Sequence, residues 1–131
     1  MKKSGVLNSD IIAAIAALGH TDSMVIADAG FPIPKDVPSI DISLIKGIPS
    51  FQQTLKAIAK DLVIESFIIA EELPKKNPGV LKSIQTVLSG VSGKKLPHEL
   101  FKKQAATANV VIRTGESSPY GNIILIAGVN F

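Results

Sequence analysis

The sequence predicts an α/β fold, a single compact layered domain with a central, largely buried β-sheet flanked by helices. Helical and extended patterns alternate along the chain, which is typical of α/β layers. The extended stretches SMVIAD and NIILIAGV are nearly continuous apolar runs, as expected of strands within a buried sheet. The length of 131 residues favours one domain that spans residues 1–131.

Four helices are predicted from their start signals, because an Asn, Ser or Pro residue that can cap or open a helix precedes each of them. They run from Ser9 to about Leu18, from Phe51 to about Leu62, from Pro78 to about Leu88, and from Pro97 onward. Strands are predicted at 23–28, 39–43, 66–72, 109–115 and 122–129. The stretch SGVSGKKL is interpreted as a connection between the third and fourth helices.

The composition excludes several classes of protein. Hydrophobic residues make up 46% of the chain and charged residues 19%, so the chain is not of the disordered type. The absence of cysteine excludes disulfides, thiolate catalysis and cysteine metal sites. The same absence fits a reducing cytoplasm. No apolar run approaches the ~20 residues of a membrane span and none precedes Asp10 as a secretory signal, so we expect no transmembrane helix, no membrane contact and no secretory signal.

The charge pattern does not favour nucleic-acid binding. The formal net charge is +3, and most of the basic residues are lysines in scattered pairs. Nucleic-acid recognition favours arginine for bidentate contacts and aromatic rings for stacking. Arg113 is the only arginine and Tyr120 the only tyrosine, so we expect no nucleic-acid partner.

The first predicted helix indicates an oligomer. No charged residue occurs between Asp10 and Asp22, and both sides of the helix are apolar. A helix that is apolar all round is buried all round, and the terminal stretch NIILIAGVNF is similarly apolar. A small domain has little interior for both segments, which favours cover from another subunit. The alternative is a central strand and a tightly packed helix within one monomer.

His20 and Asp28 are candidate site residues at the two ends of one predicted strand. His20 follows a helix end, where the helix dipole favours a protonated ring. Asp28 ends the strand, and ligands of α/β sheets gather outside the carboxyl ends of strands. The alternatives are a structural histidine and an aspartate that only caps the turn that follows it.

His98, Tyr120 and Asn122 complete the set of candidates. His98 lies near a helix start, where the dipole disfavours imidazolium, and a neutral ring suits a polar ligand. Tyr120 and Asn122 are separated by one residue, so in extended geometry they point the same way and could hold a polyhydroxylated molecule. The alternatives are a helix-surface histidine and ordinary turn chemistry.

Common catalytic motifs are missing from the sequence. Two histidines without cysteine or HExxH make a zinc site improbable, and neither a phosphate-binding glycine loop nor a GxSxG elbow occurs. We therefore expect no metal and no cofactor. The candidate residues suit acid–base chemistry on a neutral polar molecule, and their pattern alone does not name that molecule.

Four stretches carry motifs that the reasoning from single residues leaves unused: KKSGVLNSDI, LGHTDSMVIADAGFPIP, PHELFKK and VIRTGESSPYGNIIL. In this order, and over nearly the whole chain, they resemble the D-ribose pyranase family of sugar mutarotases, which also includes fucose mutarotase. Phe31 stands where leucine is more usual, and ESSPYGN replaces EATPYAN. Neither change removes a candidate site residue.

The resemblance implies an isomerase that interconverts the β-pyranose and β-furanose forms of D-ribose, which supplies furanose for phosphorylation. It implies that His20 is the proton donor and that Asp28, His98, Tyr120 and Asn122 bind the sugar. It also implies a cytoplasmic homodecamer of two pentameric rings with sites at subunit boundaries. The alternatives are a mutarotase for another sugar, such as fucose, and a non-catalytic sugar-binding protein.

Overall fold

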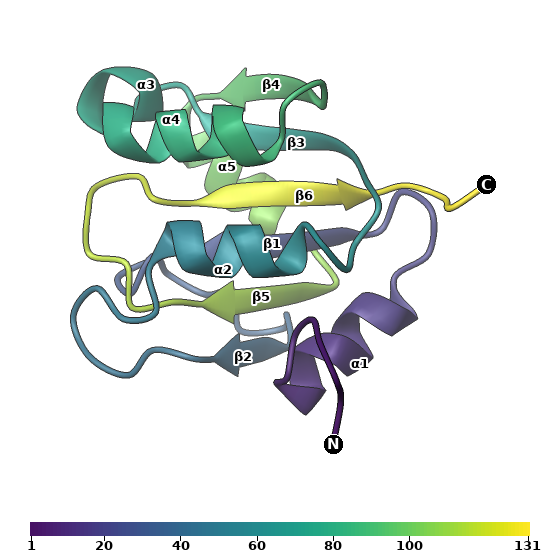
Figure 1. Ribbon diagram of the computed structural model, residues 1–131. Helices are drawn as coiled ribbons and strands as arrows, with labels where there is room; N and C mark the ends of the chain where they lie inside the picture. Colours follow the sequence, from purple (N-terminus) through teal and green to yellow (C-terminus); the bar gives the residue numbers. More distant parts are fainter.

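The computed structural model describes residues 1–131, and a six-stranded sheet lies at its centre (Figure 1). The strands are β1 (Ser23–Ala27), β2 (Ser39–Asp41), β3 (Ile64–Ala70), β4 (Ser92–Leu96), β5 (Val110–Arg113) and β6 (Ile123–Ala127), in the spatial order β2-β5-β1-β6-β3-β4. Strand β6 is antiparallel to both of its neighbours, and every other pairing is parallel. The carboxyl ends of the other five strands therefore lie along one edge of the sheet, at right angles to the strands, together with the amino end of β6.

Helices cover both faces of this sheet, which confirms the predicted fold class (Figure 1). They are α1 (Ser9–Ala17), α2 (Phe51–Ile58), α3 (Leu73–Lys76), α4 (Pro78–Val87) and α5 (His98–Ala105). Side chains from α1, α2 and α4 pack on one face, and α5 packs on the other with the segment that follows β1. The sheet is thus the middle of three layers.

Strand β1 shows why the predicted apolar runs are continuous. Successive side chains of a strand point to opposite faces, so a strand that is covered on both sides needs apolar residues at every position. Met24 and Ile26 belong to the core beneath α2, and Val25 and Ala27 belong to the core beneath α5. All four are fully buried.

Three of the four predicted helix starts are capped by side-chain hydrogen bonds, and the start at Pro97 is not. The Asn8 side chain accepts from the N–H groups of the first turn of α1. Ser50 and Gln53 form a reciprocal capping box at α2. The Asn77 side chain accepts from the Val80 N–H at α4, where Pro78 opens the helix. These local signals explain why the helix starts could be predicted from short stretches.

Two elements were missed and two were misplaced. The connection predicted at SGVSGKKL contains β4, an exposed edge strand that pairs with β3 and lacks the apolar pattern of a buried strand. The short helix α3 was not predicted. Helix α2 ends at Ile58 rather than near Leu62, because turns follow it, and β3 begins and ends two residues before the predicted 66–72.

The two apolar segments that indicated an oligomer behave differently. Strand β6 is central and buried within this one chain, which agrees with the alternative of a central strand within a monomer. Helix α1 buries only Ile11, so its alanine-rich side is left uncovered. Val129 and Phe131 of the tail are exposed as well. The model has no helix of the length and apolar character needed to cross a membrane.

Candidate active site

Polar side chains gather where β1, β3, β4 and β5 end and β6 begins. Asp28 directly follows β1, and Asn122 directly precedes β6. Because β1 and β6 are antiparallel neighbours, these two residues lie side by side. His98 starts the helix that follows β4, and Tyr120 lies in the connection from β5 to β6. The structure therefore brings four of the five candidate residues to one edge.

Asp28 and Asn122 form a two-way hydrogen-bonded pair. The Asp28 N–H donates to Asn122 Oδ1 at 2.7 Å, and Asn122 Nδ2 donates to Asp28 Oδ2 at 2.8 Å. Asp28 Oδ1 also accepts from the Gly30 N–H at 2.9 Å, so the turn-capping alternative holds alongside the pair. Each oxygen of a carboxylate accepts more than one hydrogen bond, so Asp28 keeps acceptor positions for a ligand.

His98 and Tyr120 form the second half of this edge. Their rings meet edge to face with centroids 5.0 Å apart, and His98 also stacks on Phe101 at 6.4 Å. Phe101 in turn meets Phe31 of the segment after Asp28, with centroids 6.0 Å apart. His98 Nδ1 is buried without a hydrogen-bond partner. A buried polar atom of this kind requires an explanation, and a ligand hydroxyl would supply the missing bond.

Glu72 fixes the backbone of His98. Its two carboxylate oxygens accept from the His98 N–H at 3.2 and 3.1 Å, at the first residue of α5. A carboxylate at a helix start is favoured by the free N–H groups and the dipole there. Sequence reasoning missed Glu72, although the signal that singled out Asp28 applies to it, because Glu72 also follows the end of a strand.

Glu116 holds the β5–β6 connection in place. Its carboxylate accepts from the Phe51 N–H at 3.0 Å and from the Ser118 hydroxyl at 2.8 Å. Burial acts to raise the pKa of Glu116, but the hydrogen bonds from Phe51 and Ser118 outweigh it and hold the pKa below its usual value. Asn77 anchors the same connection through the Ser118 hydroxyl and the Pro119 carbonyl.

The prediction that Tyr120 and Asn122 share extended geometry is wrong. Pro119 and Tyr120 form a turn, and Tyr120 has a φ of 56° in the left-handed region. Proline fixes its own φ at a value that suits the second position of such a turn. Thr21, next to His20, has a φ of 71° and is the only other non-glycine residue with a positive φ. Strained residues of this kind gather at functional sites.

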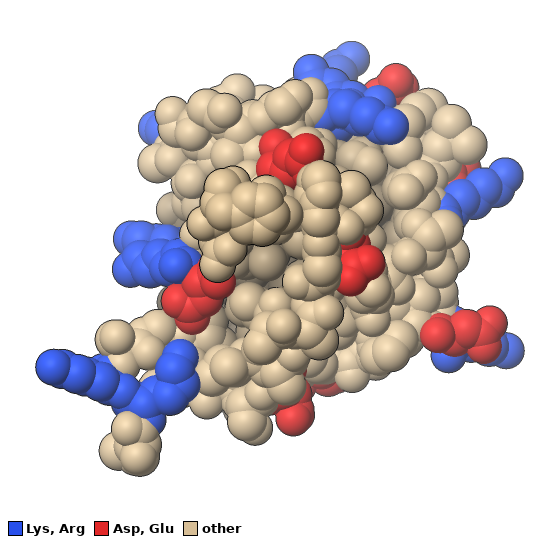
Figure 2. Space-filling model, turned by 90° about the vertical axis from the view of Figure 1, so that its right-hand side faces the viewer, with Lys and Arg blue, Asp and Glu red and all other residues tan.

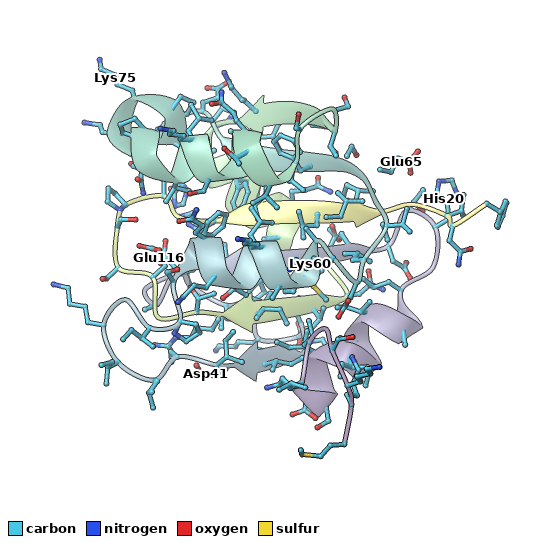
Figure 3. The ribbon with its side chains drawn as sticks, viewed as in Figure 1. His20, Asp41, Lys60, Glu65, Lys75 and Glu116 are labelled. Atoms are coloured by element: carbon cyan, nitrogen blue, oxygen red, sulfur yellow. The ribbon has the colours of Figure 1, made fainter.

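His20 lies at the opposite edge of the sheet. The five residues of β1 between it and Asp28 span about 16 Å, so one chain cannot bring both side chains to one small ligand. Figure 3 shows His20 beside the end of β6, far from Glu116 of the Asp28 edge. The resemblance implies that His20 donates a proton to the sugar that Asp28 binds, and within a single chain the two residues are too far apart for this.

Two separate hollows correspond to the two edges. One of about 370 Å³ is lined by His20 together with α1, the segment before β3 and the tail, including Val63 and Phe131. The other, of about 440 Å³, is lined by Asp28–Gly30 and Glu116–Pro119. The two hollows share no residue.

The edge with Asp28 suits a neutral, hydroxyl-rich ligand. It offers the Asp28 carboxylate as acceptor, the Asn122 amide and the Tyr120 hydroxyl, which makes no hydrogen bond within the chain. The His98 ring adds the unpaired Nδ1. No three of the chain's histidine, aspartate and glutamate side chains gather as metal ligands.

The fold and this edge define a small α/β protein whose candidate site suits a polar, hydroxyl-rich ligand. The family model of the RbsD / FucU transport protein family matches the sequence over residues 1–130, and the chain belongs to this family.

Similar proteins cover all or nearly all of the chain. The D-ribose pyranase of Geobacillus kaustophilus is 49% identical over 131 residues, which are 100% of this chain and 96% of the relative. The structure of Bacillus subtilis RbsD complexed with D-ribose is 46% identical, has a TM-score of 0.97 and is matched over 100% of both chains. The fucose mutarotase of Streptococcus pneumoniae in complex with L-fucose shares the fold, with a TM-score of 0.82 at 22% identity over 95% of each chain.

Proposed function

We propose that this protein is a D-ribose pyranase, an isomerase that interconverts the β-pyranose and β-furanose forms of D-ribose and supplies the furanose for phosphorylation. The observation that carries the proposal is the full-length match to the ribose complex of the Bacillus subtilis protein, with a TM-score of 0.97 at 46% identity. Curated D-ribose pyranases at 46 to 50% identity support it. These full-length relatives are a closer guide to activity than the word transport in the family description.

In this proposal, Asp28, Asn122, His98 and Tyr120 bind the sugar. The carboxylate and amide hold neighbouring hydroxyl groups, and His98 Nδ1 gains the partner that it lacks within the chain. His20 is the proton donor. Neither a metal nor a nucleotide takes part in this scheme.

The chemistry needs one acid and one base. A base takes the proton of the anomeric hydroxyl, the bond from C1 to the ring oxygen O5 breaks, and His20 gives a proton to O5. The product is the open-chain aldehyde. O4 then attacks C1, its proton passes to the neutral His20, and the base returns its proton to the former carbonyl oxygen. Both groups are restored, and the ring is a furanose.

The required acceleration is modest. Ring opening of a hemiacetal already proceeds without a catalyst, and a gain of ~10³-fold needs only about 4 kcal/mol. One positioned acid–base group supplies ~10²–10⁴-fold. Histidine suits this task because its ordinary pKa lies close to neutral pH.

The proposal includes a cytoplasmic homodecamer of two pentameric rings, in which His20 of one subunit completes the site of a neighbour. Its support is the separation of His20 from Asp28 across the sheet. The uncovered side of α1 and the exposed Phe131 give the His20 edge apolar surface for a neighbour. Figure 2 shows this edge, where lysine and arginine side chains stand around the margin and uncharged residues, with acidic side chains among them, fill much of the centre.

Saturation-transfer NMR on D-ribose tests the activity directly. We expect the purified protein to increase exchange between pyranose and furanose signals, and to act more weakly on L-fucose. Exchange equal to that of sugar alone would reject the proposal, and faster exchange of L-fucose would favour the fucose alternative. Light scattering tests the assembly, with an expected mass near that of ten chains and a monomer as the contradicting result.

A further inference from the structure

Glu65 contacts the ring of His20. The distance from His20 Nε2 to Glu65 Oε2 is 2.9 Å, and the two residues come from different elements. His20 lies between α1 and β1, whereas Glu65 is the second residue of β3 (Figure 3). An ionised carboxylate only accepts hydrogen bonds, so Nε2 carries a hydrogen in this pair.

A β-bulge directs Glu65 towards His20. Ile64 pairs with Ala127 of β6, and Ser66 pairs with Ile126, the next residue of β6. Glu65 is therefore the extra residue, opposed by no residue of its own. Bulges redirect a side chain and are frequent next to active sites.

The segment that carries His20 is held firmly. The Gly19 N–H donates to Asp22 Oδ2 at 2.8 Å, and the Thr21 N–H donates to the Ala127 carbonyl at 3.0 Å. Thr21 has a positive φ, and a β-branched residue is a clear outlier in that region. Hydrogen bonds thus hold the backbone on both sides of His20, and Thr21 is fixed in an unfavourable conformation.

Stability does not account for this arrangement. The side chains of His20 and Glu65 are 53% and 51% exposed, and a half-exposed ion pair adds little to folding. The neighbouring carboxylates are engaged elsewhere, since Asp22 bonds to Gly19 and Asp61 to the Val6 N–H. Glu65 is therefore the carboxylate that faces the ring.

We propose that Glu65 is a positioning residue for His20. It holds the ring in the Nε2–H form, which leaves Nδ1 as the nitrogen that exchanges protons with the sugar. A carboxylate behind a histidine sets the tautomer and stabilises the imidazolium ion. The inference rests on the proposed function, because it assigns an atom to the proton donor.

The test compares Glu65→Ala and Glu65→Gln with His20→Ala and the wild-type chain. We expect Glu65→Ala to lower ribose exchange by about 10- to 100-fold, the range found when the hydrogen-bond partner of a metal-bound histidine is removed. Glu65→Gln should lower it less, because the amide oxygen still accepts the bond without the charge. Ribose affinity and oligomer mass should not change. Asp36→Asn is the matched control, since its exposed carboxylate accepts no hydrogen bond, and we expect wild-type exchange.

A spectroscopic readout separates positioning from a structural role. In ¹⁵N NMR of the wild-type protein, neutral His20 should be in the Nε2–H form, and Glu65→Ala should mix the two forms. If Glu65→Ala fails to assemble, the comparison passes to Glu65→Gln.

Two results would overturn the role of Glu65, provided that His20→Ala is inactive. One is wild-type exchange in the Glu65 variant that assembles, and the other is an Nδ1–H form of His20 in the wild-type protein. A wild-type protein without ribose exchange overturns the proposed function instead.

Discussion

The Asn122 side chain binds Asp28 twice, accepting from its backbone N–H and donating to its carboxylate. The amide thus fixes the Asp28 carboxylate, which the proposed sugar would contact. Asn122 is only 2% exposed, so neither bond is easily replaced by water. The pair joins the end of β1 to the start of β6 at the edge with the candidate site. In the proposed function it therefore connects stability to ligand binding.

Replacement of Asn122 by alanine should weaken both properties. The Asp28 N–H would lose its acceptor, which costs about 1–3 kcal/mol when the group stays buried. The sugar would also lose a polar anchor, so we expect ribose affinity to fall about tenfold or more. Titration of ribose and urea unfolding at matched protein concentration measure the two effects. Unchanged affinity would show that Asn122 serves the fold alone.

The two histidines should respond differently to alanine. His20→Ala should remove most ribose exchange, by ~10²–10⁴-fold, while binding stays measurable, because a proton donor acts mainly in the transition state. His98→Ala should weaken binding in the manner of Asp28→Ala, because the helix start disfavours the cation that a donor needs. Exchange rates and ribose affinity of each variant check these roles. The roles are reversed if His98→Ala abolishes exchange with intact binding and His20→Ala does not.

Mixed oligomers test whether a site draws on two subunits. His20→Ala and Asp28→Ala chains, co-expressed with different tags and purified together, should regain about a quarter of wild-type exchange. A site is intact only when its His20 comes from an Asp28→Ala chain and its Asp28 comes from a His20→Ala chain, and each of these holds for about half of the sites. The control is each variant alone at the same ribose concentration. Mixed oligomers that stay as inactive as the parents would place both residues within one subunit's site.

Glu116 should make stability depend on pH. Its pKa is lower in the folded chain than its ordinary value of 4.5, so its contribution is complete above pH 4.5 and is lost as the pH falls through the folded pKa. Glu116→Gln should cost about 1–2 kcal/mol at pH 7, because the amide cannot accept all of the hydrogen bonds. The difference between the two proteins in urea unfolding should shrink below pH 4.5. A difference that is constant from pH 7 to 3 would contradict this origin.

Ribose exchange should survive chelation. The chain has neither a cysteine nor a cluster of three potential ligands, and the proposed proton transfers need no ion. Exchange rates before and after prolonged EDTA treatment should agree. Loss of exchange that one divalent ion restores would show that the histidines serve a metal.

Local signals account for what the sequence predicts well. Caps such as Ser50 act within three residues, and the continuous apolar run of β1 indicates directly that this strand is buried. Asp28 was recognised because it ends a strand. The separation of His20 from Asp28 also follows from the sequence, because a whole strand lies between them.

Other features depend on partners that are remote in the chain. Strand β4 has a polar, exposed sequence and is defined by its pairing with β3. The contact of Glu65 with His20 joins residues 45 positions apart and depends on a bulge that leaves no local pattern. The direction of the Tyr120 side chain depends on a turn, and hydrogen bonds from Asn77 to Ser118 and Pro119 hold this turn in place.

Strand β6 is the only link between the half-sheet of β2, β5 and β1 and the half-sheet of β3 and β4. Its register pairs Ser23 with Ile126, so nearly the whole chain must close as one loop before the halves join. Such long-range pairing makes folding slow and leaves neither half as an autonomous cooperative unit. Because Asn122 directly precedes β6 and binds Asp28, which follows β1, the Asp28–Asn122 pair forms in the same event. A partly folded chain therefore lacks this pair, and under the proposed function we expect ribose affinity to appear only when folding is complete.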